Sequence, residues 1–418
     1  MDPTQYIQTA ATAARAAAAT LAQTPGAARD AALRAAAVAM RDAAAALKAA
    51  NSKDLAAAQK AGLAAAMIDR LRLTDARIEA MATALEQIAD QPDPVGATLS
   101  AWNRPDGLRI EKRRTPLGVI GIIYESRPNV TADAAGLCLK SGNACILRGG
   151  SESLHSNIAI GRVLRAALEA ARLPPAAITI VDDTDHAIVT AMCRAEGLID
   201  LIIPRGGEEL IRAVVEAATV PVIKHYTGNC HVYVHAAADL DMAEAVVLNA
   251  KCQRPGVCNA AETLLVDAAI AETFLPRVAK ALMDKKVELR GCPRARKLVP
   301  AMKPATDDDW RKEYLDLILA VAVVDDLAAA IEHVNTYGSH HTDAIVTESP
   351  AAADAFVAAV DSASVMVNAS TRLSDGGIYG LGAEVGISTD KLHARGPMGA
   401  ADLTTYKWIV TGRGHVRT

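Results

Sequence analysis

The segment Gly118–Asn129 reads GVIGIIYESRPN and contains an apolar run, Val119–Tyr124, followed by a polar turn. A short apolar run of this kind, bounded by turn residues, predicts a buried β-strand. The same pattern recurs downstream, alternating with helical segments, and predicts an α/β fold with a doubly wound parallel sheet. Further strands are expected at Ala144–Leu147, Ile178–Val181, Leu198–Ile203 and Val220–Ile223, and helices at Ala132–Lys140, Leu154–Ala171, His186–Ala195 and Glu208–Ala217.

The residues before this segment are rich in alanine and predict several helices. Asp2-Pro3 is typical of a helix start, with an N-cap followed by proline in the first turn. A break is expected at Thr24-Pro25-Gly26, and the next helices are expected from about Ala27 to Ala50, after a cap at Asn51 or Ser52, and after a cap at Thr74.

A second α/β stretch follows the first, with strands expected at Val232–His235, Ala261–Val266, Ile318–Val323 and Ala344–Thr347. Two further segments alternate as exposed strands do. Leu108–Arg114 follows a strong turn signal, and Leu403–Val410 lies near the end of the sequence. An edge strand as hydrophobic as Leu403–Val410 favours pairing with a subunit partner.

The composition excludes several classes of protein. Among 418 residues, 44 Lys and Arg face 48 Asp and Glu, so the net charge is −4. This balance, with only 2 Phe, 3 Trp and 8 Tyr, argues against a nucleic-acid-binding protein. No apolar run reaches the roughly 18 residues of a membrane helix, and the start of the chain lacks the features of a secretory signal. Seven cysteines without a C-x-x-C pair indicate reduced thiols, so we expect a cytoplasmic location.

Cys258 is the candidate nucleophile, in a Pro/Gly loop just before an expected strand. Lys251 and Arg254 nearby favour the reactive thiolate, although a free cysteine is more often a small buried apolar residue. Both interpretations remain open at this point. Cys138, Cys145 and Cys193 lie in apolar patterns and are expected in the core, whereas Cys230 and Cys252 are undecided.

Nucleotide binding is suggested by two turns of the same kind. The usual G-x-G-x-x-G turn is missing after the first strand, but Arg148-Gly149-Gly150 and Arg205-Gly206-Gly207 follow two other strands of the expected sheet. No metal site is predicted, because no paired carboxylates or histidine cluster stands out. His231 and His235 lie on an expected strand, where they would be about 13 Å apart.

Several motifs together resemble the aldehyde dehydrogenase superfamily, and within it the branch whose members reduce γ-glutamyl phosphate. The matching segments span most of the chain in family order, and GAEVGIST…KLHARGPMG within Gly382–Gly399 is the most specific of them. The other matching segments are Gly118–Asn129, Ser141–Gly150, Asp200–Gly207, His225–Asn229, Gln253–Leu264, His341–Thr347 and Asn368–Arg372.

The resemblance implies an aldehyde dehydrogenase-like fold in three parts. A Rossmann-like nucleotide-binding domain is expected at residues 1–101 and 118–225, and a catalytic α/β domain at 226–397. Residues 102–117 and 398–418 are expected to form a β-hairpin oligomerisation arm, so the chain would be a homo-oligomer, a dimer or a tetramer.

The resemblance also implies roles for individual residues. Cys258 matches the nucleophile of the superfamily. The residues that resemblance and turn pattern assign to the cofactor are Arg148, Gly149, Gly206, Gly207 and Glu313. The glutamyl substrate is expected at Arg372 and Arg395, and the side-chain donor to the oxyanion at Arg127 or Asn129, between which the sequence does not choose.

The implied reaction is the NADPH-dependent reduction of L-glutamyl 5-phosphate to L-glutamate 5-semialdehyde and phosphate, through a thioester on Cys258, in proline biosynthesis. Hydrolytic relatives carry a water-activating glutamate in the segment that aligns with His225–Asn229, and this chain lacks it. A hydrolytic aldehyde dehydrogenase of broad specificity is the alternative enzyme, and an oligomeric scaffold the non-enzymatic one. A transient contact with glutamate kinase is also expected.

Overall fold

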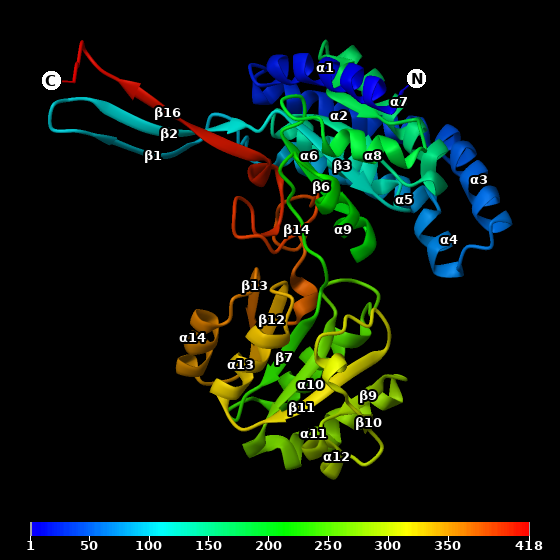
Figure 1. Cartoon of the computed structure of the whole chain (residues 1–418), viewed down its shortest axis with the longest axis vertical. Helices are drawn as coiled ribbons and strands as arrows, with labels where there is room; N and C mark the ends of the chain where they lie inside the picture. Colours follow the sequence, from blue (N-terminus) through cyan, green and yellow to red (C-terminus); the bar gives the residue numbers. More distant parts are fainter. Residues whose placement is uncertain (1, 418) are drawn as a thin grey trace. The chain divides into compact units, whose positions relative to one another are not determined.

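The computed structural model describes residues 2–417, apart from the side chain of Ala66. The chain divides into two compact units (Figure 1). The first unit comprises residues 1–224, 380–386 and 398–418, and the second comprises residues 225–379 and 387–397. Residues 380–386 cluster with the first unit, whereas the sequence placed them in the catalytic domain.

The sheet of the first unit has four parallel strands in the order β5-β4-β3-β6. Its central strand β3 (Val119–Tyr124) is buried throughout, as its unbroken apolar run predicts for a strand covered on both faces. The predicted strand at Val220–Ile223 is wrong, because this segment makes only an isolated bridge from Val222 to Ile202. The other strands are β4 (Ala144–Arg148), β5 (Ile178–Ile180) and β6 (Leu201–Arg205).

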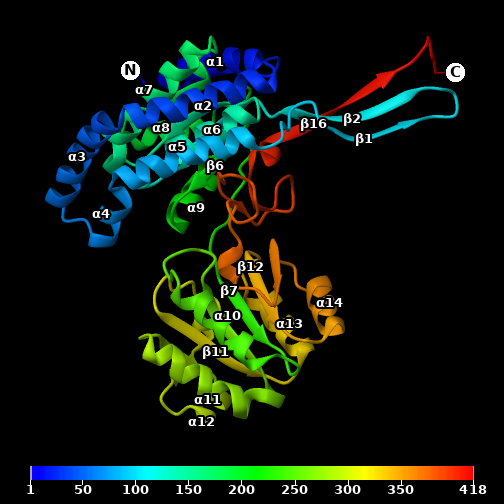
Figure 2. The same cartoon turned by 180° about the vertical axis from the view of Figure 1, so that it is seen from behind.

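Helices cover this sheet in two layers on one face and a thinner layer on the other. Helix α1 (Pro3–Leu21) packs against β4 and α8 (His186–Cys193), whereas α6 (Asn129–Lys140) and α7 (Leu154–Ala170) are covered in turn by α2 and α5 (Figure 2). The remaining helices of this unit are α2 (Gly26–Asp42), α3 (Ala44–Lys60), α4 (Ala65–Leu71), α5 (Asp75–Asp90) and α9 (Glu208–Ala217).

The predicted caps hold at two places and fail at a third. Asp2 and Thr74 accept backbone N–H groups at the starts of α1 and α5. The helix predicted from Ala27 to Ala50 is instead two helices that meet at Ala43. Asn51 does not cap a helix but lies buried within α3, where its side chain bonds the backbone of Leu71 and Leu73 at 2.8 Å.

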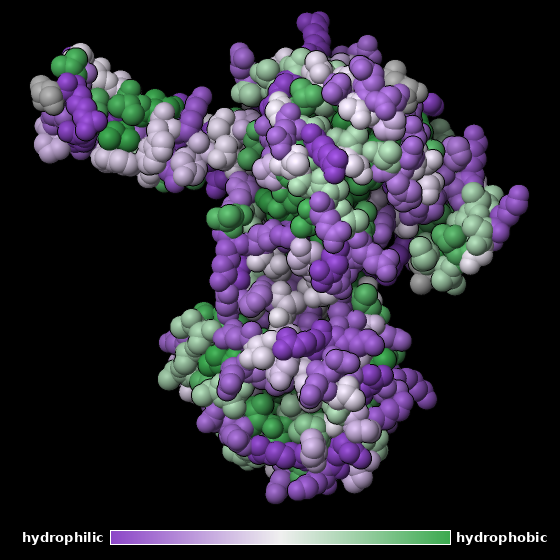
Figure 3. Space-filling view, in the orientation of Figure 1, coloured by the Kyte–Doolittle hydropathy of each residue, from purple (hydrophilic) through white to green (hydrophobic). Residues whose placement is uncertain are grey.

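A three-stranded antiparallel sheet extends from the first unit (Figure 1). It consists of β1 (Thr98–Asn103), β2 (Arg109–Pro116) and β16 (Thr404–Thr411), in the order β1-β2-β16. We call this sheet the arm. Its exposed large hydrophobic residues are Leu99, Trp102, Tyr406, Trp408 and Val410, and apolar side chains are visible on its surface in Figure 3.

The second unit has a seven-stranded parallel sheet in the order β10-β9-β11-β8-β7-β12-β13. The three adjacent strands β8, β7 and β12 are fully buried, in accordance with helices on both faces. The strands are β7 (Cys230–Val234), β8 (Ala261–Asp267), β9 (Glu288–Gly291), β10 (Lys303–Pro304), β11 (Ile318–Val324), β12 (Thr342–Val346) and β13 (Ser364–Val367).

Alternate side chains of these strands face two separate cores. One core packs the sheet against α10 (Leu240–Cys252), α11 (Ala268–Asp284) and α12 (Pro293–Leu298). The other packs it against α13 (Leu327–Tyr337) and α14 (Pro350–Ala359). A short pair, β14 (Ile387–Ser388) and β15 (Gly396–Pro397), completes this unit. Among residues 2–417, no helix combines the length and apolarity needed to cross a bilayer.

Candidate active site

Cys258 lies in the loop between α10 and β8 and is partly exposed. The Cys230 thiol donates a hydrogen bond of 3.2 Å to the carbonyl oxygen of Cys258, which fixes the backbone of the loop. Gly228 presses against the same peptide, since a Cβ built on it would lie 1.8 Å from that oxygen. Only glycine fits this approach, so the position of the nucleophile depends on a residue without a side chain.

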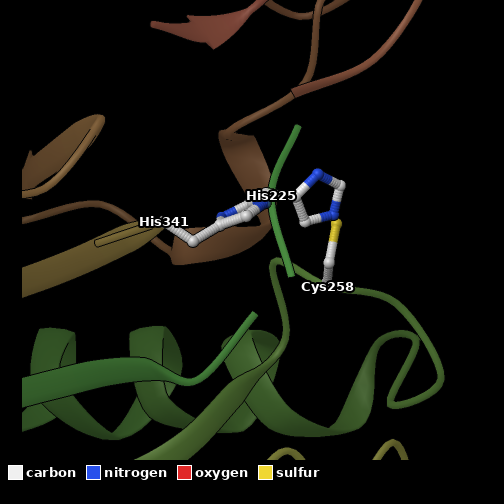
Figure 4. A group of neighbouring side chains, drawn as sticks. All are labelled: His225, Cys258 and His341. Carbon is white, nitrogen blue, oxygen red and sulfur yellow. The ribbon is translucent and has the colours of Figure 1, made fainter. Parts of the chain in front are cut away.

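Two imidazoles, those of His225 and His341, lie near the sulfur of Cys258, as Figure 4 shows. One nitrogen of His225, one nitrogen of His341 and the Sγ of Cys258 all lie within 4.8 Å of one another. The two rings meet edge to face, with centroids 5.4 Å apart. An imidazole beside a thiol can take its proton, and the three atoms together also form a donor set for a soft metal ion.

The sheet explains why these three residues meet. His225, Cys258 and His341 each precede one of three adjacent parallel strands, β7, β8 and β12. Parallel strands begin at the same edge of a sheet, so the segments leading into them converge there. The sequence predicts Cys258 as a site residue but neither of the two histidines. The available signal was the position of each histidine shortly before an expected strand.

Burial separates Cys258 from four of the six other thiols, whereas Cys252 and Cys292 are partly exposed, as Cys258 is. Cys138, Cys145 and Cys193 are buried in the first unit, as their apolar surroundings predict. Burial raises the pKa of Cys193 to about 11, and it also raises the pKa of Cys230 well above its usual range. The pKa of Cys252 is likewise raised by burial. The thiols of Cys193, Cys230 and Cys252 are therefore held in their neutral, unreactive form.

Glu313 is held close to the nucleophile loop. Its carboxylate accepts the backbone N–H of Gly228 at 3.0 Å. The segment that carries it is fixed by Glu262, which accepts the N–H of Leu315 at 3.2 Å and pairs with Lys251 at 2.6 Å. Lys251 and Glu262 are both fully buried, and burial raises the pKa of Glu262. A buried ion pair therefore supports the loop assigned to the cofactor.

Of the two arginines assigned to the substrate, Arg372 lies against the loop of Cys258. Its guanidinium bonds Gln253 at 2.9 Å and also bonds Asn259, on either side of the cysteine. Burial lowers its pKa, so its charge is incompletely solvated. Arg395 instead pairs with Asp361 at 2.8 Å, which neutralises its charge within the second unit.

Arg148 ends strand β4 in the first unit and is 8% exposed. Its Nη atoms bond the carbonyls of Gly149 and Thr184, both at 3.1 Å, and its Nε is buried without a hydrogen-bond partner in the described residues. Burial lowers its pKa. A buried guanidinium without a bonded carboxylate suits a bound phosphate.

Gly206 and Gly207 lead from β6 into helix α9 and are exposed. The backbone N–H of Gly207 donates to the carboxylate of Glu125 at 3.0 Å. A Cβ on Gly206 would lie 2.6 Å from the carboxyl carbon of Glu125. The turn therefore already binds a negatively charged group at the start of a helix. A phosphate binds to helix starts in the same way.

Arg127 lies between β3 and α6, Asn129 is the first residue of α6, and both are exposed. The amide of Asn129 donates to Asp133 at 3.0 Å, and burial raises the pKa of that carboxyl to about 6. An amide that donates to a carboxylate has its second N–H left for another acceptor. The choice between Arg127 and Asn129 as the oxyanion donor stays a prediction.

Comparison with known proteins gives a consistent result. Residues 3–302 match the aldehyde dehydrogenase family. The chain is 55% identical over 417 residues to the γ-glutamyl phosphate reductase of Geobacter metallireducens, with all of both chains covered. It is 46% identical to the crystal structure of the γ-glutamyl phosphate reductase of Thermotoga maritima, with a TM-score of 0.96 over 98% of this chain and 99% of that one.

A more distant structure shares the fold. The acetylating aldehyde dehydrogenase of Geobacillus thermoglucosidasius is 18% identical, with a TM-score of 0.71 over 100% of this chain and 98% of that one. These similarities confirm the predicted α/β fold with its parallel sheets.

Proposed function

The chain belongs to the aldehyde dehydrogenase family and, within it, to the γ-glutamyl phosphate reductases, and we propose that Cys258 is its nucleophile and NADPH its reductant. It is an oxidoreductase of proline biosynthesis that reduces γ-glutamyl phosphate with a nicotinamide cofactor. The observation that most supports the proposal for Cys258 is its place in a partly exposed loop between two imidazoles.

The proposed reaction begins with the thiolate of Cys258. Its sulfur forms a bond to the acyl carbon of L-glutamyl 5-phosphate, and the bond from that carbon to the phosphate oxygen breaks. Phosphate leaves with the electron pair, and a glutamyl thioester remains on Cys258. NADPH, when bound, supplies a hydride for reducing this thioester. The C–S bond of the resulting hemithioacetal then breaks, which releases L-glutamate 5-semialdehyde and restores the thiolate.

Charge that develops on the acyl oxygen needs a hydrogen-bond donor. One oxyanion donor is worth roughly 3–4 kcal/mol in an enzyme of this kind. We propose the backbone N–H of Cys258 for this role, together with the side chain of Arg127 or Asn129. Gly228 supports the first assignment, because it packs against the Cα and the carbonyl group of Cys258 and so restricts the backbone of this residue.

The cofactor is proposed to bind at the residues described above. Arg148 would pair with the 2′-phosphate of NADPH, since its buried Nε lacks a hydrogen-bond partner in the described residues. Gly149, Gly206 and Gly207 would leave room for the nucleotide backbone, and the carboxylate of Glu313 would hold the nicotinamide ribose.

The substrate carries a phosphate and an α-carboxylate, and arginine is suited to bind both. We propose that Arg372 binds one of them, because its guanidinium contacts residues on both sides of Cys258. Arg395 is proposed for the other. It would have to share its charge with Asp361.

Two measurements test this function. The Cys258→Ala variant should fold and bind NADPH but lose turnover, whereas Cys252→Ala, which removes a thiol at the end of α10, should keep it. Full turnover by Cys258→Ala would make the cysteine structural. Run in reverse, oxidation of the semialdehyde should require added phosphate. Oxidation without phosphate would instead support a hydrolytic aldehyde dehydrogenase.

We further propose a cytoplasmic homo-oligomer, a dimer or a tetramer, formed through the arm. The exposed apolar side chains of β1 and β16 support this proposal. A transient contact with glutamate kinase is proposed on chemical grounds. The acyl phosphate is a reactive anhydride. We therefore expect it to pass over a short distance from the enzyme that makes it to this one.

A further inference from the structure

We propose that a zinc ion binds to Cys258, His225 and His341 and, by occupying the sulfur, reversibly blocks the reaction. The binding site is inferred from geometry alone. The block rests on the proposed function, because it requires Cys258 to be the nucleophile. The sequence predicted no metal site, and the three residues are brought together only by the fold.

The donor set favours zinc over the common cellular cations. A cysteine sulfur and two imidazole nitrogens are the ligands that Zn²⁺ takes in proteins, whereas Mg²⁺ and Ca²⁺ prefer oxygen. Three protein ligands leave the fourth tetrahedral position for water, as in zinc sites that exchange ligands. Within residues 2–417, these three form the group of histidine, cysteine and acidic side chains close enough to share an ion.

The distances suit one ion. For three atoms no more than 4.8 Å apart, a common centre lies within about 2.8 Å of each, against about 2.0–2.3 Å for bonds from zinc to nitrogen or sulfur. Rotations of the side chains that bring the sulfur inward by about 0.5 Å and each nitrogen inward by about 0.8 Å would therefore complete the site. Cys258 and His225 are partly exposed, so an ion can reach them, while His341 is fully buried.

Hydrogen bonds already orient both imidazoles as metal ligands. The Nδ1 of His225 lies 2.9 Å from the carbonyl oxygen of Ile387. A carbonyl only accepts, so this Nδ1 carries the hydrogen, and the lone pair of His225 is on Nε2. The Nδ1 of His341 is bonded to the hydroxyl of Thr342 at 2.8 Å, and in the tautomer whose Nδ1–H donates to that hydroxyl the lone pair for the metal is on Nε2. Such outer partners commonly fix the tautomer of histidines that bind zinc.

Coordination changes neither the oxidation state of the protein nor that of the metal. Zn²⁺ replaces the thiol proton of Cys258, which leaves to solvent, and a Zn–S bond forms. A sulfur that shares its electron pair with zinc cannot attack the acyl carbon. Removal of the ion by a chelator, with return of the proton, restores the free thiol.

The test measures binding of the metal alone. Chelator-treated, reduced full-length protein is dialysed against Zn²⁺, and bound metal is counted by elemental analysis. We expect one Zn²⁺ per chain for wild type and for His186→Ala, which removes an exposed histidine of the first unit. We expect affinity at least tenfold weaker for His225→Ala, His341→Ala and Cys258→Ser. Co²⁺ in place of zinc should give tetrahedral d–d bands and a sulfur-to-cobalt charge-transfer band that Cys258→Ser lacks.

Wild-type protein alone gives a second readout, in case the buried His341 cannot be replaced without unfolding. Zn²⁺ should protect Cys258 from iodoacetamide, as mapped by mass spectrometry, and a chelator should restore labelling, while Mg²⁺ should do neither. Zinc that binds equally to wild type and to all three ligand variants, or that leaves Cys258 fully labelled, would overturn the site.

The two proposals fail in different ways. If zinc binds at Cys258 yet saturating zinc leaves turnover unchanged, the site stands and the role of Cys258 as nucleophile fails. If zinc does not bind there, the site fails, while a glutamyl adduct on Cys258 would still support the reaction. Inhibition by zinc with the same concentration dependence as the protection of Cys258 supports both.

Discussion

Some residues of the site position the nucleophile, whereas others are assigned to binding the cofactor. Gly228 sets the place of the Cys258 peptide, and Glu313 is held to the same glycine by a backbone hydrogen bond. The nucleophile loop and the loop assigned to the cofactor are therefore fixed to one residue. Arg148, in contrast, has a buried guanidinium whose two hydrogen bonds go to carbonyls.

The choice of cofactor is predicted to depend on Arg148. A charge-assisted contact to the 2′-phosphate contributes about 1.5–3 kcal/mol, which corresponds to at least about tenfold in affinity. Arg148→Leu should therefore raise the KM for NADPH about tenfold or more and leave the KM for NADH nearly unchanged. Arg162→Leu, at an exposed position of α7, is the matched control and should change neither. Equal losses with both cofactors would show that Arg148 serves the fold and not the phosphate.

Some residues of the site could be predicted from the sequence and others could not, for a physical reason. Cys258 stands out because a Pro/Gly loop before a strand is a local signal. His225 and His341 do not, because their nearness to Cys258 follows from the order of β8, β7 and β12 in the sheet. A single sequence does not encode that order in any local pattern.

At the scale of elements, the ion pair of Lys251 and Glu262 joins the end of α10 to β8 behind the nucleophile loop. Removing one partner leaves the other charge buried, whereas replacing both with apolar residues does not. Glu262→Leu should lower the free energy of unfolding by about 3–5 kcal/mol, and Lys251→Met/Glu262→Leu should recover most of that loss. Chemical denaturation measures both.

The same two variants distinguish the effect of the ion pair on folding stability from its effect on the position of Glu313. Both variants remove the acceptor of the Leu315 N–H, so both should raise the KM for the cofactor through the displaced Glu313. A double variant as unstable as the single one would contradict the ion-pair account. A double variant with normal KM would contradict the positioning of Glu313.

Helix α13 carries a pH-dependent contribution to stability. Burial, with His231 beside it, lowers the pKa of His333 to about 3, so the folded protein keeps this ring neutral. The unfolded chain binds a proton near pH 6.5, so the contribution is full above that pH and is lost as the pH falls toward 3. The slope is at most about 1.4 kcal/mol per pH unit.

The variant His333→Phe isolates this contribution. The ring packs edge to face on Trp310 and on His231, so phenylalanine should preserve the aromatic contacts. Between pH 6.5 and pH 5, the wild type should lose about 1.6 kcal/mol of unfolding free energy relative to the variant. If the difference in unfolding free energy stays constant over this range, the loss of stability at low pH is due to other groups.

Helices and strands were predicted well where the local sequence pattern is strong. They were predicted poorly where packing against neighbouring elements determines the structure. The buried strands β3 and β11 follow from unbroken apolar runs. The break at Ala43 has no local signal, because alanine favours helix and only packing separates α2 from α3. Val220–Ile223 has the composition of a strand but bonds the sheet at a single bridge.

At the scale of the whole molecule, the exposed apolar side chains of the arm predict a contact between subunits. Trp102 and Trp408 meet edge to face on it at 5.8 Å, and Lys112 lies 3.6 Å from the ring centroid of Tyr406. A sheet edge that carries exposed aromatic and aliphatic side chains is typically covered by another chain. The arm is therefore predicted to form the contacts between subunits.

Charge placed on the arm should separate the subunits. Trp408→Arg/Val410→Arg, at two side chains that are 53% and 57% exposed, should shift the protein to monomer in sedimentation experiments while its circular dichroism stays unchanged. Val38→Arg replaces an equally exposed apolar residue on α2, at 54%, and should leave the assembly intact. An oligomer that survives the double change would place the subunit contact elsewhere.

The chemistry of the whole molecule depends on one covalent event at Cys258, and mass spectrometry detects it directly. Enzyme is mixed with L-glutamyl 5-phosphate generated in situ, without any reduced nicotinamide, and is then quenched in acid and digested. We predict a glutamyl group on the peptide that contains Cys258 and none on those with the buried Cys138, Cys193 or Cys230. An unmodified Cys258 in protein that turns over once NADPH is added would contradict the thioester mechanism.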